Sequence, residues 1–277
     1  MESTILLFDF DGVYRTQNFY SREKCRWIHK KHMPGVCTYC DPQARNQLRE
    51  RIKDIGRPVL AFLGSGNYHY ITFFLAEKIR EDFALVLCDH HSDMKRPAFG
   101  NLLSCGNWLR QAAEHLPHLK QIVLVGVNDA ELAELPNSKK ITLFPGGTIS
   151  GGTNWVRELE QAILYPVYFS VDKDVFSKNA AWTNWNQGIM ELHQFSEAFC
   201  AVAESHSVVG MDVCGEFPAI YGNLFVSNTA NQKNNQANHE LLQLWKRHLP
   251  GPDSAKQSDN PKLPKVHRRE HNLSVKL

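Results

Sequence analysis

Leu85-Val-Leu-Cys-Asp-His-His-Ser-Asp93 is an apolar run that leads directly into two carboxylates and an imidazole. In extended backbone, alternate side chains point the same way, so Asp89, His91 and Asp93 can converge on one point while His90 faces away. Carboxylate oxygens and imidazole nitrogens are ligands of hard or borderline divalent metal ions. The segment therefore predicts a buried strand that ends in a metal site.

Two other segments share this design. Tyr165-Pro-Val-Tyr-Phe-Ser-Val-Asp-Lys-Asp174 is a second apolar run, and it ends in Asp172 and Asp174. Ala61-Phe-Leu-Gly-Ser-Gly-Asn-Tyr-His69 is a third, and it opens into a glycine-rich turn with a histidine behind it. Four carboxylates beside two histidines carry too much negative charge for one zinc ion, so the set favours two divalent ions. The six candidate ligands are His69, Asp89, His91, Asp93, Asp172 and Asp174.

Short apolar runs recur along the chain and are rich in Val, Ile, Leu and Phe, with little polar alternation. Such runs are typical of strands buried on both faces of a parallel sheet. They lie at 4–8, 58–63, 84–88, 121–127, 166–171 and 208–213, and segments with helical spacing lie between them at 42–54, 70–82, 107–117, 153–164 and 191–206. The alternation predicts a three-layer α/β/α fold with a mostly parallel, doubly wound central sheet. Such sheets bind ligands beyond the carboxyl ends of their strands, where all three metal-type motifs fall.

Composition narrows the class of protein. The 277 residues carry a formal charge of +2, which gives no electrostatic reason to expect nucleic acid or a membrane as a partner. The first residues lack the basic start and apolar core of a signal peptide, and no run of about eighteen apolar residues could span a membrane. Seven cysteines at scattered spacing argue against a disulfide framework. We expect a reduced, cytoplasmic protein with a small substrate.

We expect one domain over residues 1–250. Two stretches break the alternation: 20–41, dense in Cys, His, Lys and Trp, is expected to form a lid or a small insertion, and 174–190 a long loop over the site. Residues 251–277 have no apolar period and carry more basic than acidic groups near their end. That composition predicts a disordered tail.

Taken in chain order, Gly64–His69, Asp89–Asp93 and Ser170–Asp174 resemble the three motifs of the ureohydrolase superfamily (arginase, agmatinase and formimidoylglutamase). The resemblance covers roughly residues 60 to 220 and implies two Mn²⁺ ions. It implies that His69 and His91 each serve one ion, that Asp89 and Asp172 bridge them, and that Asp93 and Asp174 complete the shells. By the same resemblance, a hydroxide between the ions attacks a guanidinium or amidine carbon, and Asp93 relays its proton to the leaving amine.

The segment Val208-Val-Gly-Met-Asp-Val-Cys-Gly-Glu216 resembles the last core strand of that superfamily, which ends in a carboxylate that binds the cationic guanidinium. Glu216 fits by residue type, although the segment is one residue longer than the usual pattern and leaves Asp212 as the alternative. The resemblance thus implies a small-molecule or peptide guanidinium substrate. Members are often trimers or hexamers, and the sequence leaves homo-oligomerisation open.

The chain departs from the superfamily pattern at two places. Cys105 stands where arginases carry a histidine that helps in proton transfer, and a thiol does not copy an imidazole near neutral pH. The loop Asn179-Ala-Ala-Trp-Thr-Asn-Trp-Asn-Gln-Gly188 is rich in aromatic and amide groups, and Asn184 and Trp185 could line a pocket for a larger substrate. An alternative function is therefore a peptide arginase, which converts arginine side chains within a peptide into ornithine and releases urea.

Three further interpretations stay open from the sequence. Phe8-Asp-Phe-Asp-Gly-Val13 resembles the first motif of haloacid-dehalogenase-type phosphatases, with Asp9 as nucleophile and Asp11 as general acid, but no matching later motifs follow. A small zinc site could form from His29, His32, Cys37 and Cys40, although the spacing is tight and a lid with unrelated cysteines fits better. Because Cys105 replaces the expected histidine, a non-catalytic binding protein of the same fold is the third.

Overall fold

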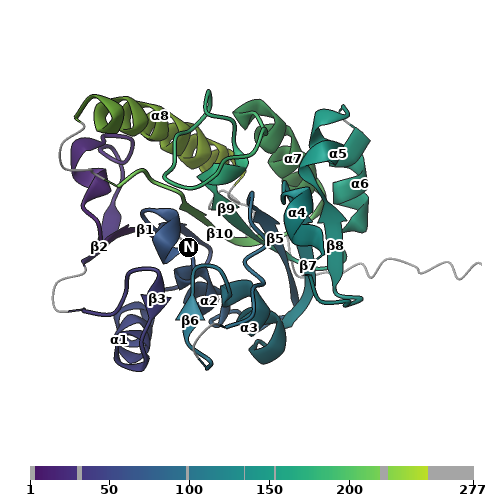
Figure 1. Cartoon of the computed structure of the whole chain (residues 1–277), viewed down its shortest axis with the longest axis horizontal. Helices are drawn as coiled ribbons and strands as arrows, with labels where there is room; N and C mark the ends of the chain where they lie inside the picture. Colours follow the sequence, from purple (N-terminus) through teal and green to yellow (C-terminus); the bar gives the residue numbers. More distant parts are fainter. Residues whose placement is uncertain are drawn as a thin grey trace, which may run out of the picture.

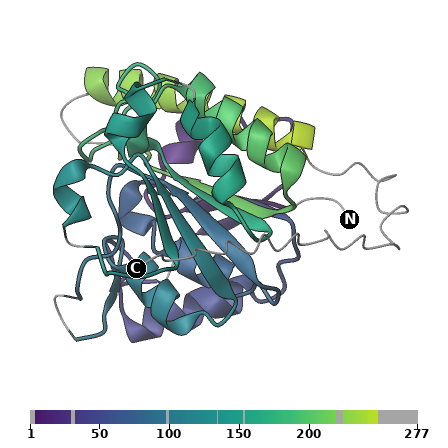
Figure 2. The ribbon, with the colours of Figure 1, turned by 90° about the vertical axis from the view of Figure 1, so that its right-hand side faces the viewer.

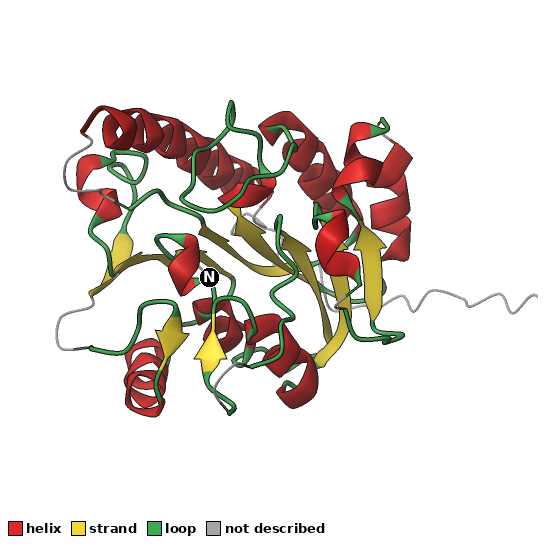
Figure 3. Ribbon diagram, in the orientation of Figure 1, coloured by secondary structure: helices red, strands yellow, loops and turns green. Residues whose placement is uncertain are grey.

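The computed structural model describes residues 4–29, 33–97, 100–133, 135–152, 154–218 and 224–248. Its centre is an eight-stranded sheet in which all neighbouring strands are parallel, as Figures 1 and 3 show. The spatial order is β2-β1-β4-β10-β9-β5-β7-β8. The strands are β1 (Thr4–Asp9), β2 (Cys25–His29), β4 (Val59–Phe62), β5 (Phe83–Cys88), β7 (Leu119–Val125), β8 (Ile141–Phe144), β9 (Val167–Asp172) and β10 (Val208–Cys214).

Helices cover both faces of this sheet and make the predicted three layers. Figure 1 shows α1 (Pro42–Ile52), α2 (Ile71–Ala76) and α3 (Trp108–His115) below the sheet. Above it lie α5 (Gly146–Ser150), α6 (Asn154–Ala162), α7 (Leu192–Ser205) and α8 (Leu224–His248), and the turned view in Figure 2 shows the same two layers. The smaller elements are α4 (Asp129–Leu132), η1 (Val13–Thr16), η2 (Gly66–Tyr68), η3 (Lys173–Val175) and an antiparallel pair, β3 (Tyr39–Cys40) with β6 (Leu103–Ser104).

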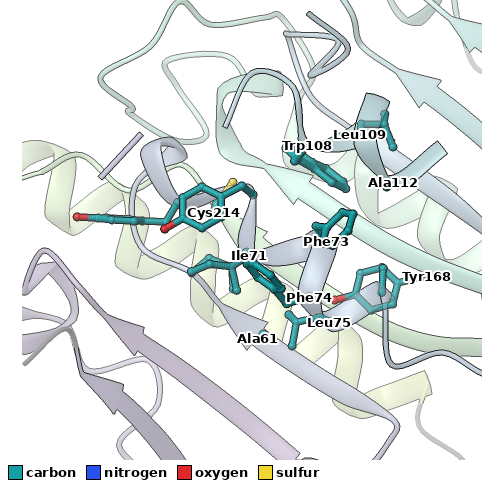
Figure 4. Packing of buried hydrophobic residues seen from close by; sticks show 14 of the residues in the cluster. Ala61, Ile71, Phe73, Phe74, Leu75, Trp108, Leu109, Ala112, Tyr168 and Cys214 are labelled. Carbon is teal, nitrogen blue, oxygen red and sulfur yellow. The ribbon is translucent and has the colours of Figure 1, made fainter. Parts of the chain in front are cut away.

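Two separate apolar cores explain why the strands show little polar alternation. Leu85 and Leu87 of β5 pack into the core that contains α2 and α3, whereas Val86 packs into the core that contains α6 and α7. Figure 4 shows the first core, in which Phe73 and Phe74 of α2 lie among side chains that include Trp108 and Tyr168. Because both faces are buried, alternate residues of each central strand must be apolar on both sides.

Six strands and five helices match the segments predicted from sequence, with one clear shortening, because helix 70–82 ends at Ala76. The structure adds β2, β8 and α8, which the sequence did not predict. The segment 20–41 is only in part a lid or insertion, because β2 within it pairs in parallel with β1 as an edge strand of the main sheet. The predicted basic tail, 251–277, lies outside the described residues. Within the described chain, no helix combines the length and apolar character needed to cross a membrane.

Candidate metal centre

The three predicted metal-binding segments meet at one edge of the sheet. His69 follows β4, Asp89 follows β5, and Asp172 is the last residue of β9. The order β4-β10-β9-β5 makes these strands near neighbours, and all of them run in parallel, so their carboxyl ends share an edge. The structure therefore brings together side chains that are about one hundred residues apart along the chain, as the sequence predicts.

His69 is held in one orientation by a buried chain of hydrogen bonds. Its Nε2 lies 2.9 Å from Oγ of Ser170, and that hydroxyl donates to Oδ1 of Asp212 over 2.8 Å. Tyr168 also donates its hydroxyl to Asp212, over 2.7 Å. Since the Ser170 proton is directed at Asp212, its oxygen accepts the Nε2 proton of His69. The Nδ1 lone pair is then free to bind a metal ion, as outer partners commonly arrange for ligating histidines.

Asp89 lies between two groups of ligand atoms. Its Oδ2 is 3.2 Å from Nδ1 of His69, and its Oδ1 is 3.5 Å from Nδ1 of His91. One group consists of His69, Asp89 and Asp93, and the other of Asp89, His91 and Asp174, with all ligand atoms of a group within 4.8 Å of one another. A carboxylate that contributes one oxygen to each of two clusters is the arrangement expected of a bridging ligand.

The remaining carboxylates are fixed around these clusters. Oδ2 of Asp93 is 2.9 Å from Nδ1 of His69 and also accepts the indole proton of Trp108. Asp93 has a φ of 50°, an uncommon backbone conformation for a residue other than glycine and one that is often found at functional sites. Oδ2 of Asp174 is 2.9 Å from Nδ1 of His91.

Asp172 approaches only the His69 side in the described structure. Its Oδ2 is 3.6 Å from Nδ1 of His69 and accepts a proton from the thiol of Cys214 over 3.0 Å. Its Oδ1 accepts the backbone N–H of Asp174 over 3.0 Å. His69, Asp172 and Cys214 thus form a third group of possible ligand atoms, while His90 lies outside all three.

The electrostatics of the site fit bound cations. Burial raises the pKa of the Asp174 carboxyl to about 7, and the negative charge of Asp89 adds to that shift. Burial likewise raises the pKa values of Asp93 and Asp172. Burial lowers the pKa of His91, but hydrogen bonds to Asp174 and Asp89 outweigh it and raise that pKa to about 11. Among the described residues, imidazoles are the basic groups in direct contact with these four buried carboxylates, and two divalent ions would neutralise the carboxylates.

A cavity of about 220 Å³ opens onto these ligands. One wall is the β3–β6 pair, which contributes Tyr39 and Ser104, together with Thr38 and Cys105 next to these strands. Burial raises the pKa of the Cys105 thiol to about 12, so this side chain is neutral near pH 7. The structure thus places Cys105 at the cavity as a neutral thiol.

The opposite wall is the loop that follows η3. The ring of Trp185 lines the cavity and meets the ring of His91 edge to face, with centroids 5.7 Å apart. A Cβ at Gly66 would lie 3.1 Å from the Trp185 ring and 3.0 Å from Oδ2 of Asp172, so glycine lets this loop close against the site. Asn184 is exposed and is not among the described residues that line the cavity.

Glu216 is close to the ligands in the sheet but does not line the cavity. Its Oε1 forms a buried ion pair with Lys173 and accepts a hydrogen bond from Nδ2 of Asn238 over 2.6 Å. Its Oε2 accepts a hydrogen bond from Nε2 of Gln17 over 2.8 Å. The carboxylate predicted to hold the substrate is therefore already bound by the protein's own groups. Asp212, the sequence alternative, is engaged with Tyr168 and Ser170.

The phosphatase interpretation finds no support in the structure. Asp9 accepts hydrogen bonds from the exposed Arg15 and lies 3.3 Å from Nδ1 of His29, while Asp11 accepts the backbone N–H of Ser65 over 3.0 Å. Both acidic residues end β1 or follow it, beside the turn after β4.

The described residues give no support to the small zinc site either. His32 lies outside the described residues, and the ligand clusters found in the described chain include none of His29, Cys37 and Cys40. All seven cysteines are free thiols, and the sequence also argued against disulfide bonds between them.

The site contains several groups that the sequence reasoning missed. Two of them had a signal: Lys173 stands between Asp172 and Asp174, so in extended backbone it points away from them, and Lys95 follows Asp93 by two positions. Other groups had none, because they come from distant elements. These are Trp108, Cys214, Asn238 and Gln17.

A family model described as Arginase family matches residues 20–223. An uncharacterized protein of Thermotoga maritima is 28% identical over 213 residues, which are 76% of this chain and 79% of that protein.

Solved structures agree in fold. An arginase from Bacillus cereus superposes with a TM-score of 0.64 at 15% identity, over 91% of this chain and 99% of the other. A hypothetical agmatinase from Burkholderia thailandensis gives 0.63 at 17% identity, over 91% and 88%. A formimidoylglutamase from Bacillus subtilis gives 0.61 at 12% identity, over 89% and 87%.

Proposed function

Because this chain belongs to the arginase family, we propose that it is a hydrolase that uses two Mn²⁺ ions to cleave a C–N bond at a guanidinium or amidine carbon. The observation that carries the proposal is the position of Asp89, which gives one oxygen to each of two ligand clusters at the floor of a cavity. The complete set of candidate ligands argues against a non-catalytic binding protein.

The six predicted ligands, His69, Asp89, His91, Asp93, Asp172 and Asp174, would hold the two ions. When bound, the ions would lower the pKa of water and supply a hydroxide nucleophile near neutral pH. Asp93 lines the cavity, and its Oδ2 is fixed by Trp108 and His69. We therefore assign to Asp93 the transfer of a proton to the leaving amine, for which a general acid must be held within hydrogen-bond reach.

The charges at the cavity favour a substrate whose far end is anionic. Among the described residues that line the cavity, the only carboxylates are the candidate ligands, and the two metal ions would neutralise them. Lys95 and Arg96 also line it. Lys95 forms an ion pair with Glu131, with Nζ and Oε1 3.4 Å apart. A second cationic group on the substrate, such as the amine of agmatine, would have no free partner there. We propose guanidino acids and N-formimidoyl amino acids as the first class to test.

Arginine side chains within peptides are the second candidate. Tyr39 and Trp185, each 38% exposed, flank the cavity. They offer aromatic surface to the peptide residues on either side of the arginine that would be hydrolysed. Direct contact between Glu216 and a guanidinium would require the displacement of Lys173. In this proposal Glu216 therefore does not touch the substrate and acts through its ion pair with Lys173.

A substrate screen tests the proposed function. The Mn²⁺-loaded protein would be incubated with arginine, agmatine, guanidino acids, N-formimidoyl amino acids and arginine-containing peptides, and urea, ammonia and ornithine would be measured. We expect release from at least one class and none from the Asp93→Ala variant. A fully Mn²⁺-loaded protein that acts on none of these classes would contradict the proposal.

A further inference from the structure

One face of α8 carries amide side chains where a buried helix face usually carries apolar ones. Asn231, Asn234, Asn235 and Asn238 follow one another at spacings of three, one and three residues, which places them on one side of a helix. The side chains of Asn234 and Asn238 are completely buried. Because a buried amide is destabilising unless its polar atoms are hydrogen-bonded, the partners of these two residues indicate what this face does.

Asn234 holds the loop that carries Trp185. Its Oδ1 accepts the backbone N–H of Trp182 over 3.0 Å, and its Nδ2 donates to the carbonyl of the same residue over 2.8 Å. The side chain thus satisfies both backbone groups of one loop residue, as a neighbouring strand would. Three residues later, Trp185 closes the wall of the metal cavity against His91.

Asn238 holds the buried ion pair behind the metal-binding turn. Its Oδ1 accepts from Nζ of Lys173 over 3.1 Å, and its Nδ2 donates to Glu216 over 2.6 Å and to Oε1 of Gln17 over 2.8 Å. Lys173 lies between Asp172 and Asp174 in the chain. A shift of this pair would therefore move the backbone that presents two metal-type ligands.

The other half of α8 anchors the helix without these amides. Leu241, Leu242 and Trp245 are buried in the core that covers this face of the sheet. Figure 1 shows α8 lying along that layer. This half therefore attaches the helix by apolar contacts, whereas the two buried asparagines of the other half bind two separate parts of the site. The helix also begins at Leu224, beyond the segment 20–223 that the family model matches.

We propose that α8 positions the active site through two buried asparagines: Asn234 fixes the Trp182–Trp185 loop as the substrate-facing wall, and Asn238 fixes the Lys173–Glu216 pair behind the metal-binding turn. The inference rests on the proposed function for its meaning in catalysis, but both contacts can be tested without turnover. Asn234 and Asn238 are positioning residues, since neither lines the cavity.

The test compares Asn234→Ala, Asn238→Ala and the control Asn228→Ala, an exposed asparagine of the same helix, in the full chain. Hydrogen exchange over residues 182–188 and Mn²⁺ affinity by titration are measured for each variant. Asn234→Ala should speed exchange in that loop about tenfold and leave Mn²⁺ affinity unchanged. Asn238→Ala should leave the loop protected and raise the Mn²⁺ dissociation constant about tenfold, as the loss of an outer partner of a metal site does. Asn228→Ala should change neither.

If Asn238→Ala does not fold, Gln17→Ala takes its place, because it removes a donor from Glu216 and leaves α8 intact. Equal effects of the two asparagine variants on both measurements, or no effect of either, would overturn the inference. Where a substrate is found, Asn234→Ala should raise KM more than it lowers kcat. The protein could be inactive on all substrates while Asn234→Ala changes only loop exchange and Asn238→Ala changes only Mn²⁺ affinity. That result would contradict the proposed function and leave the positioning role in place.

Discussion

Two sets of buried carboxylates lie at the same edge of the sheet and differ in what neutralises them. Within the described residues, the partners of Asp89, Asp93, Asp172 and Asp174 are imidazoles, an indole, a thiol and backbone N–H groups. Glu216, one strand away, forms an ion pair with Lys173 and receives hydrogen bonds from two amides. Both sets are carboxylates at the same sheet edge. Their partners differ: Glu216 is paired with a lysine, which cannot bind a metal ion, whereas the four aspartates are paired with imidazoles, which can.

This contrast arises where β9 ends at Asp172 and the chain turns into η3 at Lys173. Asp172 and Asp174 point toward the cavity, and Lys173 between them reaches the layer of α8. The same three residues therefore contribute to both sets. Each prediction below changes one side of the comparison.

The largest effect is expected from the loss of the shared ligand. Asp89→Ala removes an oxygen from each cluster, so bound Mn²⁺ and hydrolysis should fall together, with activity at least about 1000-fold lower, as for loss of a principal electrostatic group. Elemental analysis of the purified protein and product release measure the two losses. Asp129→Ala, at an exposed carboxylate, should change neither. An Asp89→Ala variant with full activity and no metal would refute the binuclear site.

The next effect concerns Glu216 and its partner Lys173. Lys173→Met leaves Glu216 as an uncompensated buried charge, and the free energy of unfolding should fall by about 3–5 kcal/mol. The double variant Lys173→Met/Glu216→Gln removes both charges and should recover most of that loss. Urea denaturation at neutral pH measures both. If the single and double variants were equally destabilised, the ion pair would not be the cause.

In the metal-free protein, the candidate ligands Asp174 and His91 should make stability depend on pH. The folded-state pKa of Asp174 is raised from the model-peptide value of 3.8 to about 7, so the folded state binds this proton more tightly than the unfolded state does. Its effect is to make the metal-free protein less stable as pH rises from about 4 to 7. His91, with its pKa raised to about 11, contributes stability that is likewise lost as pH rises above its ordinary value.

Metal-free protein should therefore be less stable at pH 8 than at pH 5.5, by about 2 kcal/mol from each of these two groups. Mn²⁺ should reverse this order, since the ions take the place of the bound protons. Thermal unfolding at the two pH values, with and without Mn²⁺, measures both effects. Unfolding that is independent of pH without metal would contradict the assigned charges.

The smallest effect is expected at the rim of the cavity. Arg96→Ala should raise KM for a guanidino acid about tenfold and leave agmatine nearly unaffected, because a partly exposed charge acts on an anionic substrate with about 1.4 kcal/mol. Steady-state kinetics on the two substrates measure the difference. A variant that loses activity on both to the same degree would remove the basis for an acidic substrate class.

Much of the candidate site could be predicted because its chemistry is local in sequence. The apolar run before Asp89 specifies a strand and the sheet edge at which it ends. The extended backbone expected for Asp89, His91 and Asp93 is wrong, because β5 ends at Cys88 and these residues lie in the bend that follows. The same reasoning failed at β2, which is short and only partly buried, and at α8, whose asparagine-rich half hides the helical period. It also failed to separate Glu216 from the other carboxylates, since a carboxylate after a buried strand has the same pattern whatever its partner is.

The sequence by itself specified the parallel sheet, the edge at which the site lies and the six candidate ligands, because an apolar run and the polar residues that follow it are local features of the chain. Only the tertiary structure decided the role of Glu216, the closure of the Trp185 loop and the contacts of Asn234 and Asn238. These depend on β10 being inserted between β9 and β4, and on α8 packing over them. Such neighbours are set by the order of strands and helices in space, which no local pattern of residues encodes.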